Sequence, residues 1–130
     1  MGGKYKICDF GSAIQQPVDY DSLEKREKYA FNEYIELHST LMYRSPEMIE
    51  PSGRVIGQQS DIWMLGCIAY LLTFRKHPFH EQGKLAILTN NPPYPLEGPL
   101  PDLVRSMLVV DPLNRPSADS LITIINSRLQ

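Results

Sequence analysis

Cysteine and an excess of charge of either sign are what this 130-residue sequence has least of. Its two cysteines, Cys8 and Cys67, are too few for a scaffold of disulfide bonds. Lysine and arginine number 13 and aspartate and glutamate 15, so the net charge is −2. Nucleic acids and anionic membranes attract proteins with a surplus of positive charge, which is missing here. We therefore expect no nucleic-acid binding.

A signal for membrane insertion or export is also missing. The longest apolar run, 62–72, contains a glycine and is too short to span a bilayer. The amino terminus has no apolar signal core, and Lys6 stands where a myristoylation sequence needs Ser or Thr. Hydrophobic residues make up 42% of the chain, enough for one packed domain. We expect no membrane insertion and a soluble, cytoplasmic protein.

Apolar periodicity predicts a mainly α fold around one central helix. Residues 60–74 are apolar on every helical face, with Ser60 as the expected cap, and such a helix needs neighbours on all sides. Four of its side chains are therefore expected to be nearly free of solvent: Trp63, Leu65, Ile68 and Leu72.

Shorter elements are expected on either side of this helix. Alternating polar and apolar residues predict a strand at 4–8. The charged stretch 22–28, with Ser22 at its start, fits the beginning of a capped helix or a solvated loop equally well. Further helices are predicted at 84–88, at 100–108 and after Ser117, separated by a proline-rich connector at 92–101. The last helix is expected to bury one stripe: Ala118, Leu121, Ile122, Ile125 and Leu129.

Four short motifs follow one another along the chain. Asp9-Phe10-Gly11 comes directly after the predicted strand, where a carboxylate can hold Mg²⁺ against nucleotide phosphates. The others are Ser-Pro-Glu at 45–47, Asp-Ile-Trp-Met-Leu-Gly at 61–66 and Asp-Pro-Leu-Asn-Arg-Pro-Ser at 111–117. Each motif alone is a weak signal, but four in this order are far more specific.

In this order the motifs resemble the C-terminal lobe of a eukaryotic protein kinase, over essentially the whole sequence. The resemblance implies a partial kinase domain at 1–130, with a short N-terminal strand, an activation segment at 9–47 and no N-terminal lobe. Thr40 is typical of Ser/Thr kinases, whereas Ser45 stands where the family usually has Ala. Residues 8–13, 43–48 and 74–79 further resemble the Numb-associated kinase group, which implies clathrin-adaptor partners and a role in vesicle traffic.

The resemblance also implies roles at the nucleotide and substrate sites. Asp9 would bind Mg²⁺ between the phosphates of ATP, and Thr40 would hydrogen-bond the catalytic aspartate. Phe10 would pack into the lobe, and Gly11 would let the loop turn. Cys8 would flank the nucleotide site, although a buried apolar thiol is the alternative.

Four other residues receive structural roles from the same resemblance. Glu47 and Arg115 would form a buried ion pair, for which the planar guanidinium is well suited. Asp61 would accept hydrogen bonds from the backbone of the catalytic loop. Trp63 would pack behind Pro46.

The glycine-rich loop, the lysine-bearing strand and the His-Arg-Asp loop of a kinase do not occur in this sequence. Phosphoryl transfer needs all three. We therefore expect a parent Ser/Thr kinase that phosphorylates protein substrates, and a 130-residue chain that is inactive alone and self-associates through its uncovered apolar helix. The alternative is a non-catalytic, kinase-like module that binds protein partners.

Overall fold

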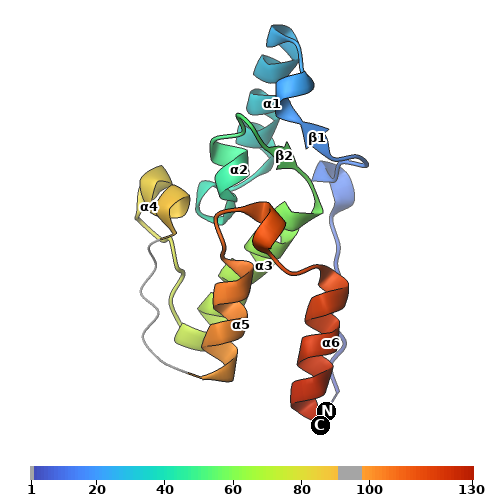
Figure 1. Cartoon of the computed structure of the whole chain (residues 1–130), viewed down its shortest axis with the longest axis vertical. Coiled ribbons are helices and arrows are strands. Elements are labelled where there is room, and N and C mark those ends of the chain that lie inside the picture. The colour runs from blue at the N-terminus through green and yellow to red at the C-terminus, as the bar shows by residue number, and fades with distance from the viewer. Residues whose placement is uncertain (1, 91–97) are drawn as a thin grey trace.

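The computed structural model describes residues 2–90 and 98–130, and this part of the chain is built mainly of helices (Figure 1). The mainly α prediction is thereby confirmed. A two-stranded antiparallel sheet pairs β1 (Val18–Asp19) with β2 (Val55–Ile56). The helices, in chain order, are α1 (Lys25–His38), α2 (Pro46–Ile49), α3 (Gln58–Phe74), α4 (Gly83–Thr89), α5 (Pro99–Met107) and α6 (Ala118–Leu129).

Helix α3 lies at the centre of the packing, and α5 runs beside it (Figure 1). Trp63 is fully buried and stacks on Phe79, with ring centroids 5.4 Å apart. A Cβ on Gly66 would come within 2.9 Å of Met107 and Leu108, so the absence of a side chain there lets α5 approach closely. The core around this contact consists of Trp63, Cys67, Tyr70, Phe79, Ile87, Val104 and Leu108.

One face of α3 departs from the prediction of burial all round. Trp63 is buried as predicted, but Leu65, Ile68 and Leu72 are 48%, 44% and 67% exposed. Their expected burial is wrong for this chain, because no element of residues 2–90 and 98–130 covers that stripe. Ser60 is not the cap either: α3 begins at Gln58, after Gly57.

The stretch 22–28 resolves in favour of a helix rather than a loop. Helix α1 begins at Lys25 and projects from the rest of the molecule (Figure 1). Glu24, not Ser22, is its N-cap, and the backbone N–H of Glu24 donates to the Glu27 carboxylate over 2.8 Å. This reciprocal capping box satisfies N–H groups that the first turn leaves free.

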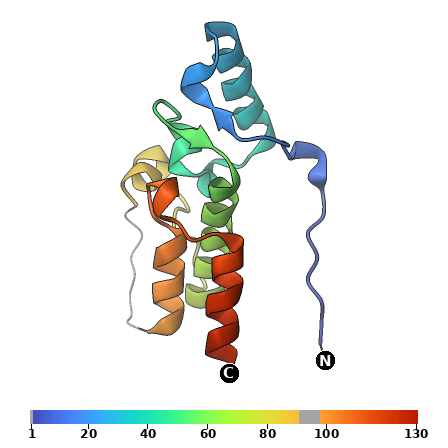
Figure 2. The same cartoon turned by 45° about the vertical axis from the view of Figure 1, so that its right-hand side comes forward.

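The predicted strand at 4–8 is wrong. These residues have no regular secondary structure, their side chains are exposed, and the segment runs apart from the helices (Figure 2). Alternating hydrophobicity creates a strand only where a neighbouring strand supplies hydrogen bonds, and no described segment pairs with this one.

The later helices match their predicted positions. Helix α4 contains 84–88, and α5 begins at Pro99, with Pro101 also in its first turn, where proline is tolerated. These two prolines were expected in the connector, whose residues 92–97 lie outside the described part of the chain.

Helix α6 is capped as predicted but buries less than predicted. The Ser117 hydroxyl accepts a hydrogen bond from the backbone N–H of Ser120 over 3.1 Å. Leu121 packs with Ile62 and Met107. The other members of the predicted stripe are exposed, because α6 contacts its neighbours along a narrow strip only: Ala118, Ile122, Ile125 and Leu129.

Candidate functional site

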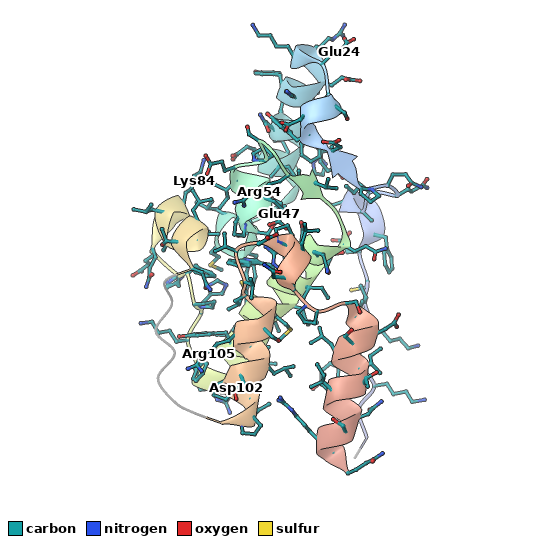
Figure 3. All side chains as sticks on the ribbon, in the orientation of Figure 1. Glu24, Glu47, Arg54, Lys84, Asp102 and Arg105 are labelled. Atoms are coloured by element: carbon teal, nitrogen blue, oxygen red, sulfur yellow. The ribbon has the colours of Figure 1, made fainter. Side chains whose placement is uncertain are left out.

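The predicted ion pair between Glu47 and Arg115 is confirmed. Both side chains are fully buried, and they meet in a two-pronged contact. Arg115 Nη1 donates to Glu47 Oε1 over 2.7 Å, and Nη2 donates to Oε2 over 2.8 Å. The pair joins α2 to the segment before α6, across 68 positions of sequence. Figure 3 shows Glu47 at the centre of the molecule, between these elements.

Arg115 also hydrogen-bonds three backbone carbonyls. Its Nε donates to Val109 O over 2.7 Å, Nη1 to Gln59 O over 2.7 Å, and Nη2 to Val110 O over 3.1 Å. The guanidinium carbon also lies 5.1 Å from the centre of the Trp63 ring, within the range of a cation–π contact. One side chain therefore joins α2, the first turn of α3 and the loop after α5.

The electrostatics of Glu47 follow from these partners. Burial by itself would raise the pKa of Glu47, but the hydrogen bonds and charge of Arg115, with a 2.7 Å hydrogen bond from the Ser60 hydroxyl, hold that pKa below its ordinary value. The carboxylate is therefore ionised at neutral pH. Trp63 and Pro46 are both buried. The expected packing of Trp63 behind Pro46 stays a prediction.

The Asp-Phe-Gly residues lie in the exposed N-terminal segment. Asp9 has a positive φ of 64° and precedes a single turn of 3₁₀ helix, Phe10–Ser12. Phe10 is 69% exposed, so its predicted packing into the lobe is wrong for this chain. The carboxylate of Asp9 is open to solvent and to ligands.

The two thiols lie in opposite environments. Cys8 is exposed, so the buried-thiol alternative is wrong for it. Cys67 is the buried thiol, and burial raises its pKa to about 12, which keeps it protonated and unreactive.

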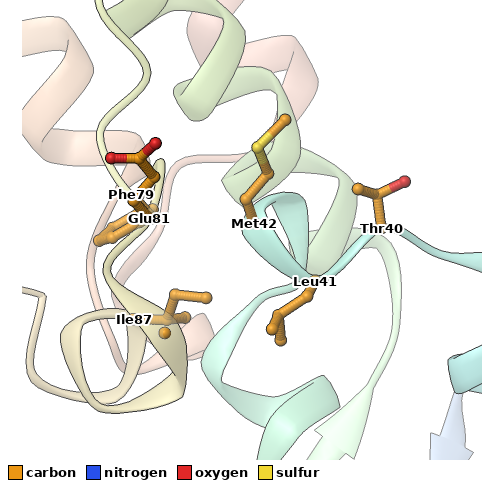
Figure 4. Close-up of a pocket in the computed structure, with 7 residues that line it drawn as sticks. Thr40, Leu41, Met42, Phe79, Glu81 and Ile87 are labelled. Carbon is orange, nitrogen blue, oxygen red and sulfur yellow. The ribbon is translucent and has the colours of Figure 1, made fainter.

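Thr40 borders a hollow of about 290 Å³ between the 3₁₀ turn Leu41–Tyr43 and α4 (Figure 4). The lining is mainly apolar, with one carboxylate from Glu81. Figure 4 shows Leu41 and Ile87 on facing sides of this hollow. An apolar depression with a hydroxyl at its edge suits an extended peptide or an apolar side chain of one.

Asp61 lies beside a second hollow of about 440 Å³, between the first turn of α3 and Ser117. Partial burial raises the pKa of Asp61, and within residues 2–90 and 98–130 its carboxylate has no hydrogen-bond partner. Its expected partner, a catalytic-loop backbone, is not part of this sequence, so that role stays a prediction.

Sequence reasoning missed one residue of this region. Arg44 is 5% exposed and turns back to bind the end of α1. An arginine in a loop is usually solvated, so the residue type carried no signal; its proximity to the end of α1 appears only in three dimensions.

The chain thus has a helical fold around α3, a buried Glu–Arg pair and an apolar hollow with the Thr40 hydroxyl at its edge. The protein kinase domain family matches residues 1–124, and the chain belongs to that family. No helix in the described residues has the length and hydrophobicity needed to cross a membrane.

The relatives are named as kinases, and several of them as serine/threonine-protein kinases. A probable serine/threonine-protein kinase of Dictyostelium discoideum is 37% identical over 129 residues, which covers 95% of this chain and 11% of that protein. Serine/threonine-protein kinase sel-5 of Caenorhabditis elegans is 42% identical over 118 residues, covering 87% of this chain and 11% of that protein. Actin-regulating kinase 1 of Saccharomyces cerevisiae is 37% identical over 131 residues, covering 95% of this chain and 20% of that protein. The chain thus spans a fifth or less of each of these relatives.

Proposed function

We propose that this chain is the C-terminal lobe, from the Asp-Phe-Gly motif onward, of a Ser/Thr protein kinase of the Numb-associated group, most similar to cyclin-G-associated kinase. The observation that carries the proposal is the buried Glu47–Arg115 pair, which fixes the end of the activation segment 9–47 to the rest of the lobe. The parent protein would transfer the γ-phosphate of ATP to Ser or Thr of protein substrates. Its partners would include the clathrin-adaptor machinery, and its location would be the cytoplasm.

The nucleotide end of the proposal rests on Asp9. Mg²⁺ in nucleotide sites commonly takes one or two carboxylates together with phosphate oxygens and water, so a single exposed carboxylate fits as one protein ligand. Among the described residues no cluster of three His, Cys, Asp or Glu side chains forms, so this segment would hold the metal only together with ATP and other parts of the parent. Cys8, Phe10 and Gly11 would flank the nucleotide.

The substrate end rests on the hollow beside Thr40. Its apolar lining from Leu41, Met42 and Ile87 would receive the substrate chain next to the phosphorylated residue. The Thr40 hydroxyl, at the edge of the hollow, would hydrogen-bond the catalytic aspartate of the parent and so help to orient the substrate hydroxyl.

The decisive experiment compares the isolated chain with the complete parent kinase. We expect no ATP-dependent phosphate transfer from residues 1–130, because the positioning of ATP and most of the charge stabilisation come from elsewhere. In the parent, Asp9→Asn should abolish transfer, whereas Asp102→Asn, an exposed change on α5, should leave it unchanged. An Asp9→Asn parent with full activity would contradict the proposal, and an inactive wild-type parent that still binds adaptor proteins would favour the binding-module alternative.

A further inference from the structure

Arg44 is nearly buried, yet it belongs to a loop and carries a full positive charge. Its side chain runs back to the C-terminal turn of α1 and makes four polar contacts there. Nε donates to Ser39 Oγ over 2.8 Å, and Nη2 donates to Ser39 O over 3.0 Å and to Glu36 O over 3.4 Å. Nη1 lies 3.1 Å from the Glu36 carboxylate.

Two of these acceptors, the carbonyl oxygens of Glu36 and Ser39, are groups that a helix end leaves without partners. The last carbonyls of α1 have no N–H further along the helix, and they form the negative end of the helix dipole. A guanidinium at this position satisfies two of the carbonyls and carries the complementary charge. The Glu36 side chain is 61% exposed, so the charge pair is the weaker part of the contact and the carbonyl bonds are the more specific part.

The backbone of Arg44 closes the other side of the same loop. The Arg44 N–H donates to Leu41 O over 3.1 Å, and the Tyr43 N–H donates to Thr40 O over 3.0 Å. Residues 39–44 therefore form a closed turn, held to α1 by the Arg44 side chain. The outer side of this turn is the rim of the hollow, formed by Thr40, Leu41 and Met42.

We propose that Arg44 is a positioning residue for the peptide-binding loop: it clamps residues 39–44 to the end of α1 and so fixes Thr40 and Leu41 at the hollow. The functional half of this inference rests on the proposed kinase function, but the clamp itself does not. Lysine is a poor substitute, because a single ammonium group cannot present the planar fork that reaches Ser39 and Glu36 together.

Amide hydrogen exchange on this chain tests the clamp without reference to activity. In Arg44→Met, we expect the amides of His38 and Tyr43 to exchange about tenfold faster or more. The order of fast and slow amides within α3 should be the same as in the wild type. Arg44→Lys should give a smaller increase. Arg26→Met, an exposed change at the far end of α1, is the matched control and should alter neither amide.

Two further variants keep the test decisive if Arg44→Met fails to fold. Ser39→Ala removes one acceptor of the clamp and should speed exchange at the same two amides by a smaller factor. Glu36→Gln removes the charge but leaves the carbonyl bonds, and should have the least effect. Unchanged exchange at His38 and Tyr43 in both Ser39→Ala and Arg44→Lys would overturn the clamp.

The functional half is tested in the complete kinase. With Arg44→Lys, we expect kcat/KM for a peptide substrate to fall by about tenfold while KM for ATP stays within about twofold, because a loosened loop displaces Thr40 and Leu41 and not the phosphate site. An Arg44→Lys kinase with an unchanged kcat/KM for the peptide, or with a KM for ATP that rises by the same factor, would refute the positioning role. An inactive wild-type parent would instead count against the proposed function, and the exchange data would still decide the clamp.

Discussion

Replacing Arg115 by alanine is the sharpest test of what holds this lobe together. The change removes the only cation that contacts the fully buried Glu47 carboxylate among the described residues, leaving it with hydrogen bonds from the Ser60 hydroxyl and from the backbone. Breaking a buried ion pair from one side costs about 3–5 kcal/mol, because an uncompensated charge stays behind. The carbonyls of Gln59, Val109 and Val110 each also lose one donor, at a cost of about 1 kcal/mol or more for each carbonyl left without another donor or water.

The size of this loss has to be compared with the whole stability of the chain. Domains of this kind unfold with a free energy of about 5–15 kcal/mol, so Arg115→Ala should remove most of it. Urea titration followed by far-ultraviolet circular dichroism measures the difference. If the alanine variant is too unstable to fold, Arg115→Lys should fold with an intermediate loss, because lysine restores the charge but not the two-pronged contact.

The control is a surface pair of the same chemistry. Arg105 and Asp102 lie 3.3 Å apart on the outer side of α5, and both are largely exposed (Figure 3). Exposed pairs contribute about 0.2–1 kcal/mol, so Arg105→Ala should shift the unfolding midpoint little. An Arg115→Ala variant that is no less stable than Arg105→Ala would refute the reasoning.

Three further predictions concern pH, packing and association. Burial and the nearby His80 lower the pKa of His77, and Arg115 lowers the pKa of Glu47. Both groups therefore stabilise the folded state at pH values above their ordinary pKa values of 6.5 and 4.5. The melting temperature should fall on acidification below about pH 6.5, and a melting temperature that is constant down to pH 4 would contradict this. Gly66→Ala should lower the free energy of unfolding by about 1 kcal/mol, because overlap with Met107 and Leu108 outweighs the gain in helix propensity; a more stable variant in urea titration would contradict it. The isolated chain should self-associate and bind a hydrophobic-surface dye, and light scattering should show that Ile68→Lys reduces this while Leu85→Lys, an exposed change on α4, does not; a monomeric, dye-silent wild type would contradict it.

The parts that were predictable from sequence are those in which local chemistry determines the outcome. Ser117 caps α6 because its hydroxyl reaches an N–H three residues away, which depends on no distant segment. The Glu47–Arg115 pair is distant in sequence, and only the family resemblance supplied that pairing. Local chemistry therefore predicted the cap, whereas the resemblance predicted the ion pair.

The failures share a different cause. Residues 4–8 alternate as a strand does, yet a strand forms only with a partner, and no described segment provides one. The role of Arg44 was not predicted at all. Its partners are backbone carbonyls at the end of α1, and residue types do not indicate contacts with backbone atoms. Elements that depend on a neighbour are therefore the ones that the sequence predicts least well.

Helix α3 combines both cases within one element. Its side towards α5 is buried because Gly66 and the residues around it meet Met107 and Leu108 closely. Its stripe of Leu65, Ile68 and Leu72 is equally apolar but lies open. An apolar helix face predicts that burial would be favourable, but it does not identify the segment that would cover it. The open stripe is therefore apolar surface that α3 could still bury against a neighbour. Asp61 of the same helix has no hydrogen-bond partner for its carboxylate among the described residues, and partial burial raises the pKa of its carboxyl group.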